Sequence, residues 1–296
     1  MISVLIPTYN YSIIDLVQEL YQQIKETEVP FEIIIADDSS TNKKVSIKNK
    51  EFLSRITDCI YIENHKNIGR TATRNLLAKK AVFDNLLFLD ADIMPRHKNF
   101  IHLFLKSSLE KNDLIFGGIT YKKESFNPDC SLRWKFGNER EEKNVQQRNK
   151  NPYLSIISGC IFIKKDCFIE FNSFLDDFYG TDILFTYNLK INRINVLHIN
   201  NPVYHLGLEH NKKFLRKSKK AIETLIHFEE KELLPNNYSS LQKAYLKLKK
   251  NGLTKIFKYI INPFNIKIEK ILQTKTPPLF LFDLYRLYYL VKLKDY

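Results

Sequence analysis

The stretch LLFLDAD at residues 86–92 decides the fold. Residues 86–89 form a short apolar run without helical spacing, which is typical of a buried parallel strand. Asp90 and Asp92 follow at its end, where open α/β sheets bind their ligands. Residues i and i+2 of an extended segment point the same way, so both carboxylates can converge on one hard cation, and that cation can neutralise a diphosphate. Taken alone, the pair is equally typical of a solvated turn.

The composition is that of an ordinary globular protein. The chain has 296 residues, 44% hydrophobic and 27% charged, which suits one large α/β domain with a smaller appendage. None of the 8 glycines forms a dinucleotide-binding or P-loop motif. We expect no secretory signal and no membrane span. The four cysteines lack C-x-x-C spacing, which favours buried, reduced thiols in a cytoplasmic protein over a zinc site.

Strands and helices are expected to alternate over the first ~120 residues. Such alternation predicts βαβ units and a mainly parallel, doubly wound sheet flanked by helices. Ser12 and Asp15 have the spacing of a capping box, and Asp166 is a candidate helix N-cap. A long polar loop is expected at 121–153. Strands are predicted at 3–6, 31–36, 60–63, 86–89, 114–119 and 153–163, and helices at 69–82 and 182–191.

The positive charge is concentrated in the C-terminal part of the chain. Residues 211–296 contain 19 Lys and Arg against 7 Asp and Glu, whereas residues 1–210 contain 27 against 26. The sequence from 211 onward is helical in pattern, basic and rich in aromatic residues. We therefore expect a domain at 1–210 and a helical extension at 211–296.

Four polar segments follow the expected strands or open an expected helix. Because the carboxyl ends of parallel strands meet at one edge of a sheet, these segments should share a crevice. Their residues are Pro7, Thr8, Tyr9 and Asn10; Asp37, Asp38, Ser39 and Ser40; Asn67, Gly69, Arg70 and Arg74; and Asp90 with Asp92.

In this order the four segments resemble the family 2 glycosyltransferases, inverting enzymes of the GT-A fold. The resemblance covers about residues 1–210, and the stretch 201–209 resembles bacterial members that assemble surface polysaccharides. It implies a metal-dependent glycosyltransferase that moves a sugar from a UDP-sugar to a glycan or lipid-linked glycan acceptor in cell-surface polysaccharide synthesis. It also implies that the domain has a nucleotide-sugar half at about 1–120 and an acceptor half at about 121–210.

The resemblance assigns a role to each segment. Asp37 or Asp38 would bind the base, since a carboxylate accepts the N3–H of uracil. The stretch Pro7, Thr8, Tyr9 and Asn10 would line the nucleoside, and Arg74, with Arg70, would face the nucleotide. Structural alternatives are a turn or N-cap for Asp37 and Asp38 and a surface ion pair for Arg74.

A metal site and a catalytic base complete the implied set. Asp92 would bind Mn²⁺ or Mg²⁺, Asp90 would assist at the metal or the ribose, and His205 is the third candidate ligand. Family members usually place the base in a Glu-Asp pair after a glycine. Here Thr181 replaces the Glu, Asp182 keeps the position of the base, and the spacing from Gly180 is one residue short. Asp176 and Asp177 are nearby alternatives, and Glu209 is an alternative partner for a tail lysine.

Three other functions compete with this interpretation. A nucleotidyltransferase would have a basic phosphate loop after the first strand, which the stretch 6–10 lacks. A non-catalytic glycosyltransferase-like subunit of a membrane complex would explain the altered Thr181-Asp182 pair. Nucleic-acid binding through the lysines of the tail has only charge in its favour. Charge gives nonspecific affinity, so no specific nucleic acid is expected as a partner. For the tail, the charge and aromatic content suggest binding to an anionic membrane surface, on the inner face of the cell membrane, and the alternative is a helical subdomain with solvated lysines. The two interpretations are compatible with each other and with a transferase.

Overall fold

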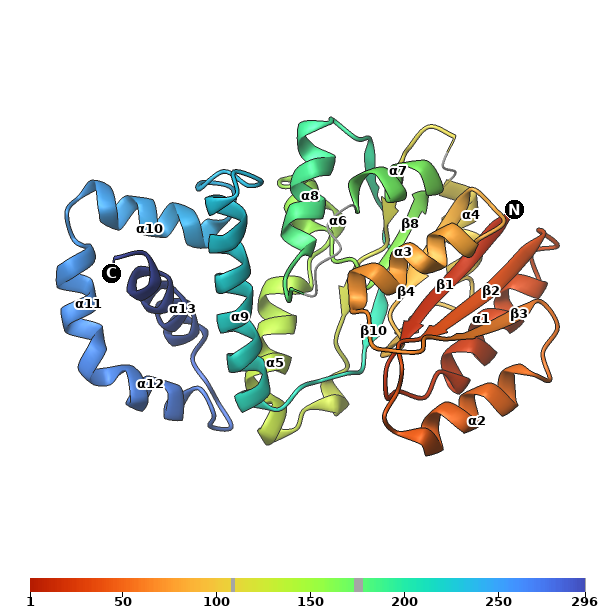
Figure 1. Ribbon diagram of the computed structural model, residues 1–296, viewed down its shortest axis with the longest axis horizontal. Coiled ribbons are helices and arrows are strands. Elements are labelled where there is room, and N and C mark those ends of the chain that lie inside the picture. The colour runs from red at the N-terminus through yellow and green to blue at the C-terminus, as the bar shows by residue number, and fades with distance from the viewer. Residues whose placement is uncertain (108–109, 173–177, 296) are drawn as a thin grey trace. The chain divides into compact units, whose positions relative to one another are not determined.

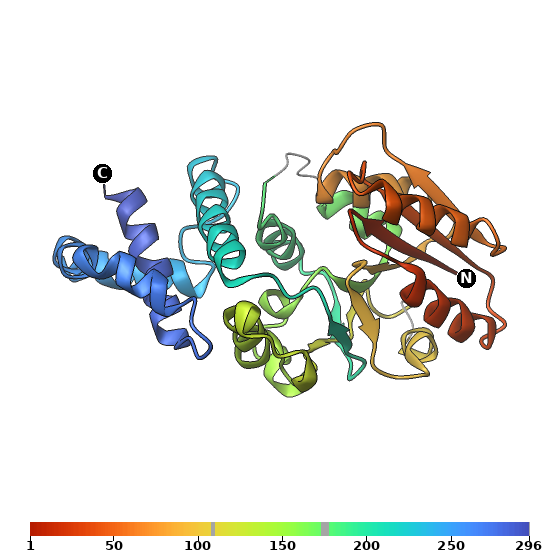
Figure 2. The ribbon, with the colours of Figure 1, turned by 90° about the horizontal axis from the view of Figure 1, so that it is seen from below.

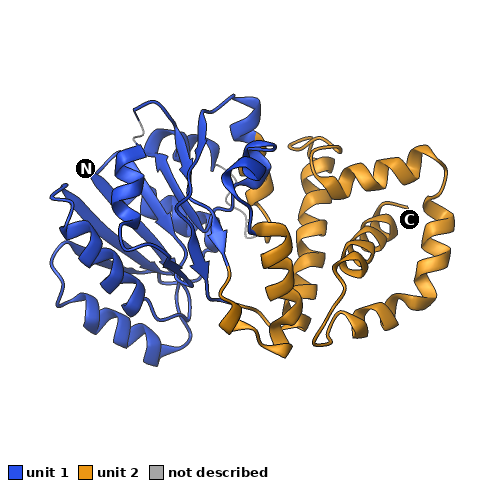
Figure 3. Ribbon diagram, turned by 180° about the vertical axis from the view of Figure 1, so that it is seen from behind, with its two compact units in different colours: residues 1–120, 142–177, 188–207 blue, residues 121–141, 178–187, 208–296 orange. Residues whose placement is uncertain are grey.

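A computed structural model describes residues 1–107, 110–172 and 178–295 of the chain. The contacts divide it into two compact units (Figure 3). The first consists of residues 1–120, 142–177 and 188–207, and the second of residues 121–141, 178–187 and 208–296. The helical residues after 207 therefore group with the segments 121–141 and 178–187.

The first unit is built on a seven-stranded sheet in the order β3-β2-β1-β4-β8-β6-β9 (Figure 1). The first four strands of that order run parallel, whereas β8 is antiparallel to β4 and β6. This confirms the mainly parallel α/β sheet. The strands are β1 (Ile2–Thr8), β2 (Phe31–Asp37), β3 (Cys59–Glu63), β4 (Asn85–Leu89), β6 (Leu114–Phe116), β8 (Cys160–Lys164) and β9 (Val196–His198).

Helices on both faces explain the apolar runs in the central strands. β1, β2 and β3 advance in one direction and the chain then returns to β4, so right-handed crossovers place α1 and α2 on one face and α3 on the other. The side chains at 33–35 and 86–89 are fully buried as a result. The helices are α1 (Ile14–Lys25), α2 (Lys43–Leu53), α3 (Arg70–Lys80), α4 (Phe100–Ser107), α6 (Val145–Asn149), α7 (Lys165–Phe171) and α8 (Asp182–Ile191), which continues from the second unit.

A small three-stranded sheet extends from the end of β4. It contains β5 (Ile93–Pro95), β10 (Val203–His205) and β7 (Ile119–Thr120), with β10 in the middle. The prediction of a single strand at 114–119 is therefore wrong. Gly117 and Gly118 interrupt it, and Gly118 has a φ of +106°, so β6 and β7 enter different sheets.

Several local predictions also need correction. Within the stretch 153–163, residues from Cys160 onward form β8, while Tyr153–Ser155 is a 3-10 turn. Helix α1 begins at Ile14 without a side-chain cap, so the capping box is absent. Asp166 is not the N-cap of α7, because that helix begins at Lys165 directly after β8. The expected loop at 121–153 contains several short helices.

The second unit is helical, which confirms the predicted helical extension. Helices α9–α12 lie around α13 (Figures 1 and 2), and α13 contacts each of them. Leu132, Phe214, Phe282 and Tyr285 belong to one of its buried apolar clusters. The elements are η1 (Lys123–Ser125), η2 (Pro128–Cys130), α5 (Ser131–Phe136), η3 (Gly137–Glu141), α9 (Asn211–Glu230), α10 (Ser240–Lys250), α11 (Thr254–Ile261), η5 (Asn262–Phe264), α12 (Asn265–Ile271) and α13 (Leu279–Lys294).

Two further expectations concern the whole chain. In the part of the chain that the structure describes, no helix has both the length and the apolar character needed to cross a bilayer. All four cysteines are free thiols. Cys130, Cys160 and Cys167 are buried, as expected, whereas Cys59 is half-buried.

Candidate active site

The loops after β1 and β2 are held together by hydrogen bonds. Thr8 pairs with Asp37 in the sheet register, and the backbone N–H of Asp38 donates to the Thr8 carbonyl at 2.9 Å. Asn10 has a φ of 54°, its N–H donates to Ser40 Oγ at 2.8 Å, and its side-chain oxygen accepts from the Asn42 N–H at 2.8 Å. These bonds bring the first two predicted segments to one edge of the sheet.

The Asp37 carboxylate lies inside this loop arrangement. One oxygen accepts from the Ser40 N–H at 2.8 Å, and the other accepts from Ser46 Oγ at 2.8 Å and from the Tyr61 hydroxyl at 2.7 Å. Burial raises the pKa of Asp37, but the hydrogen bonds from Ser40, Tyr61 and Ser46 outweigh burial and lower it below its usual value.

The Asp38 carboxylate holds the segment that leads into α3. It accepts from Asn64 Nδ2 at 2.9 Å and from the backbone N–H groups of Ile68 at 2.9 Å and Gly69 at 3.0 Å. The carboxylates of Asp37 and Asp38 thus both accept hydrogen bonds within the protein, as expected if these residues serve in a turn or as a helix N-cap. The base-binding role of either residue stays a prediction.

The other residues of the first segment lie at the same edge. Thr8 is buried, and its hydroxyl donates to the Tyr11 carbonyl at 3.2 Å. Pro7 is half-buried and the Tyr9 side chain is 47% exposed. Pro7 and Tyr9 are therefore partly accessible to a ligand from the edge where Asp37 lies.

Asp90 is bound by two arginines of α3. Arg70 Nη2 lies 2.7 Å from Asp90 Oδ2, and Arg74 donates to Oδ1. Arg74 also donates to the hydroxyl of Ser158 at 3.1 Å and to its carbonyl at 3.0 Å, and Arg70 donates to that hydroxyl at 3.2 Å. Burial raises the pKa of Asp90, but the charges of Arg70 and Arg74 outweigh it and lower the pKa. Asp90 is therefore a carboxylate within an arginine cluster.

Asp92 points instead toward the small sheet. His205 Nε2 lies 3.6 Å from Asp92 Oδ2, and the backbone N–H of Leu206 donates to the Asp92 carbonyl at 2.8 Å. A Cβ on Gly207 would stand 1.9 Å from Asp92 Oδ2, so only glycine leaves room for this carboxylate. Burial raises the pKa of Asp92, and Asp90 adds to the increase while His205 opposes it.

The predicted three-ligand metal set is not assembled. Across residues 1–107, 110–172 and 178–295, no three His, Cys, Asp or Glu side chains gather as a metal site. The physical reason is that the Asp90 carboxylate binds Arg70 and Arg74. Asp92 and His205 face each other, and the Asp92 carboxylate occupies the space that a side chain on Gly207 would need. This oxygen and nitrogen pair fits Mn²⁺, and the Asp92 carboxylate alone fits Mg²⁺, if phosphate oxygens and water supply the remaining ligands.

The predicted base lies in the second unit. Asp182 is the first residue of α8, whose predicted bounds are confirmed. Its catalytic role stays a prediction, and Asp176 and Asp177 fall outside the described residues. The alternative role of Glu209 is confirmed, since this residue pairs with Lys217 and lies 3.6 Å from Lys213 Nζ.

Sequence reasoning missed two residues of this site. Ser158 joins the arginine cluster, and the only signal was its position in a Ser-Gly pair immediately before β8. Gly207 limits the space around Asp92, and its signal was a glycine two residues after the candidate ligand His205. Both act through backbone or short side-chain geometry, which composition and spacing do not reveal.

Comparison with known proteins identifies a family and a fold for this chain. A family profile described as glycosyl transferase family 2 matches residues 3–171. Over 120 residues the chain is 33% identical to the chondroitin synthase of Pasteurella multocida strain Pm70, covering 40% of this chain. The matching segment spans only 12% of that much longer relative.

Solved structures with a similar fold include two complexes with nucleotide sugars. One is the mannosyltransferase PcManGT from Pyrobaculum calidifontis in complex with GDP-Man and Mn²⁺, with a TM-score of 0.57 and 14% sequence identity. The alignment covers 99% of this chain and 87% of the PcManGT chain. The other is S. aureus TarS 1-349 in complex with UDP-GlcNAc, with a TM-score of 0.50 and 17% sequence identity. The alignment covers 96% of this chain and 89% of the TarS chain. At these identities the likeness concerns the fold, which is that of the GT-A transferases.

Proposed function

Because this chain belongs to glycosyl transferase family 2, we propose that it transfers a sugar from a UDP-sugar to a glycan or lipid-linked glycan acceptor. The observation that carries this proposal is the convergence of Asp92, His205 and the Arg70–Arg74–Asp90 cluster at the sheet edge where β1 and β2 also end. Such an edge is where open α/β sheets bind nucleotides.

The donor half of the proposal rests on charge and hydrogen bonding. Arg70 is half exposed and can reach a phosphate or ribose oxygen, while the more buried Arg74 holds Asp90 and Ser158 in position. Pro7, Thr8, Tyr9 and Asn10 line the nucleoside. Asp37 or Asp38 recognises uracil, either through a carboxylate oxygen or through the loop that each residue holds.

Asp92 and His205 are the proposed metal ligands. A bound Mn²⁺ or Mg²⁺ would neutralise the negative charge that develops on the departing nucleoside diphosphate. The PcManGT complex, a protein of similar fold, contains Mn²⁺ and a nucleotide sugar. Asp90 contributes to this site by keeping Arg70 and Arg74 beside it.

Asp182 is the proposed base. It takes the proton of the acceptor hydroxyl as that oxygen attacks C1 of the sugar from the side opposite the diphosphate, which inverts the configuration at C1. Thr181 stands where relatives usually carry a Glu, so we expect acceptor choice to differ from theirs. A role in cell-surface polysaccharide synthesis on the cytoplasmic side of the membrane is part of the same proposal.

A non-catalytic subunit is the second candidate, because of the altered Thr181-Asp182 pair. A panel of nucleotide sugars with Mn²⁺, screened by thermal shift and then by release of nucleoside diphosphate, separates the two. We expect a UDP-sugar to stabilise the protein and to be turned over when acceptor is present. Stabilisation without turnover of any donor, with or without acceptor glycans, would favour the non-catalytic subunit.

The Asp182→Asn variant tests the base directly. We expect it to abolish transfer while leaving the affinity for the donor unchanged. Asp166→Asn is a matched control, since Asp166 is also an aspartate in the first turn of a helix, α7. Full turnover by Asp182→Asn would remove this residue from the mechanism.

A further inference from the structure

Helix α11 exposes one stripe of apolar side chains, while Phe257 and Ile261 pack against the buried clusters of the second unit. None of its residues is buried. Ile256, Tyr259 and Ile260 have the spacing i, i+3 and i+4 of one helical stripe, and they are 56%, 84% and 53% exposed. An amphipathic helix of a globular protein normally turns such a stripe toward the core. This one is turned away from it.

The exposed apolar surface continues along the chain on both sides of the stripe. Leu253 precedes α11 and is 41% exposed, Phe264 in η5 is 52% exposed, and Ile266 in α12 is 71% exposed. We call residues 253–267 the α11 surface. Several large apolar side chains exposed in one short segment indicate an interaction site.

The charge around the α11 surface has a single sign. Between Glu232 and Glu269 the sequence contains seven lysines and no Asp or Glu. Three of them, at positions 255, 258 and 267, lie within the α11 surface itself. The occupant of this surface must therefore offer both apolar contacts and negative charge.

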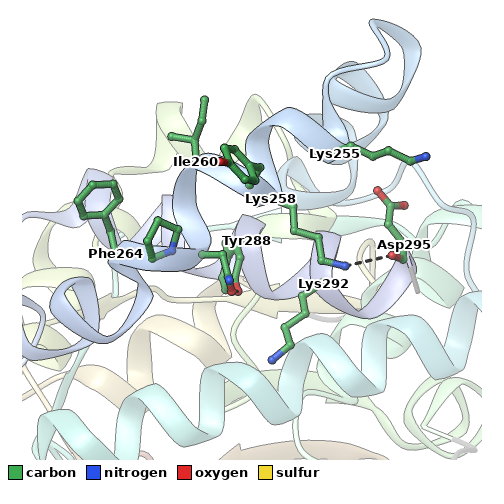
Figure 4. A pocket seen from close by; sticks show the side chains of 10 residues that line it. Lys255, Lys258, Ile260, Phe264, Tyr288, Lys292 and Asp295 are labelled. Carbon is green, nitrogen blue, oxygen red and sulfur yellow. Dashed lines mark hydrogen bonds between the residues drawn. The ribbon is translucent and has the colours of Figure 1, made fainter.

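A cavity of about 970 Å³ opens beside α11 (Figure 4). Lys258 Nζ donates to the backbone carbonyl of Asp295 at 3.2 Å, as Figure 4 shows. Lys255 and Lys292 also line the cavity, and neither forms a hydrogen bond or ion pair with any residue that the structure describes. Tyr259 and Phe264 supply its apolar wall. Two lysines are thus available to anionic groups next to an apolar surface.

We propose that the α11 surface docks on an anionic phospholipid bilayer. The apolar side chains would lie at the level of the headgroups, and Lys255 and Lys292 would contact lipid phosphates. A second copy of the chain fits less well, because it would bring the same lysines into mutual repulsion. The proposal does not depend on which sugar is transferred, and its test uses no activity measurement.

Flotation of the full chain with vesicles tests the proposal. We expect binding to vesicles of 70% phosphatidylcholine and 30% phosphatidylglycerol, weak binding to pure phosphatidylcholine, and weaker binding as salt increases. Lys255→Glu with Lys292→Glu should reduce the partition coefficient at least about 25-fold, at about fivefold per lysine. Lys44→Glu with Lys48→Glu, on exposed positions of α2, makes the same change in net charge and should have little effect.

A second pair of variants tests the apolar contacts. Tyr259→Ser with Ile266→Ser should weaken binding about tenfold, whereas Ile47→Ser with Val82→Ser, which are exposed elsewhere, should not. The proposal is overturned if the wild type does not float with anionic vesicles, or if the two lysine pairs lose binding equally. It is also overturned if Tyr259→Ser with Ile266→Ser leaves vesicle binding intact but abolishes a dimer of the wild type.

Discussion

Gly207 lies so close to Asp92 that a Cβ on the glycine would stand 1.9 Å from the Asp92 carboxylate oxygen Oδ2. The loop after β10 therefore determines where the acidic side chain after β4 can go. Asp92 and His205 come from segments more than a hundred residues apart in the sequence, and β5 and β10 bring them together by pairing His205 with Ile93.

Gly207→Ala should displace the Asp92 carboxylate. We expect the affinity for UDP in the presence of Mn²⁺ to fall about 10- to 100-fold, as when groups that orient a metal ligand are disturbed. Calorimetry with and without Mn²⁺ measures this. Gly252→Ala is the control, because a Cβ there meets no atom within 4 Å and only its positive φ is strained. Unchanged Mn²⁺-linked affinity in Gly207→Ala would contradict the role of this contact.

Arg74→Met and Arg70→Met should differ in their effect on stability. The Arg74 side chain is 4% exposed, so its loss leaves Asp90 and Ser158 with the half-exposed Arg70 alone and should lower the free energy of unfolding by about 2–3 kcal/mol. The Arg70 side chain is 46% exposed, and its loss should cost at most about 1 kcal/mol. Urea denaturation compares the two. If both variants lost the same free energy of unfolding, the greater burial of Arg74 would not make it the more stabilising of the two arginines.

Asp38→Ala tests whether the Asp38 carboxylate holds the segment before α3. It removes the acceptor of three hydrogen bonds, two of them from backbone N–H groups, and should destabilise the fold by about 2–3 kcal/mol. Glu51→Ala, at an exposed position of α2, is the control. If Asp38→Ala were as stable as the wild type, the Asp38 carboxylate would have no structural role, and only the proposed base-binding role would remain.

The buried imidazole of His198 should make the fold sensitive to acid. Burial, with the nearby charge of Arg148, lowers the pKa of His198 from 6.5 to about 4. The unfolded chain therefore takes up this proton at a higher pH than the folded chain. This group leaves the free energy of unfolding unchanged above pH 6.5. Between pH 6.5 and about 4 it lowers the free energy of unfolding by up to about 3 kcal/mol.

His198→Gln should remove this part of the pH dependence. His102→Gln, at an exposed position, should keep it. Denaturation between pH 7 and pH 4 measures the slopes. If His198→Gln and the wild type lose stability in parallel, the imidazole is not the group responsible.

The strands were predictable because burial on both faces imposes continuous apolar runs. Residues 33–35 and 86–89 illustrate this, and the bounds of α8 also followed from the sequence. The division of 114–119 between two sheets was not predictable, since it depends on the conformations of Gly117 and Gly118.

The site was predictable only in part, for a similar reason. The sequence indicated Asp90 and Asp92 as one metal-binding pair, because alternate residues of a strand point the same way. The structure separates their environments, since α3 supplies Arg70 and Arg74 to Asp90 while β10 supplies His205 to Asp92. Such partners come from distant segments, and a local motif does not specify them.

Calorimetric titration of UDP into the wild type and Asp92→Ala, each with and without Mn²⁺, tests the central claim most directly. The account predicts that Mn²⁺ strengthens UDP binding to the wild type and that Asp92→Ala loses this gain while keeping its metal-free affinity. Equal strengthening by Mn²⁺ in both proteins would contradict a metal site at Asp92.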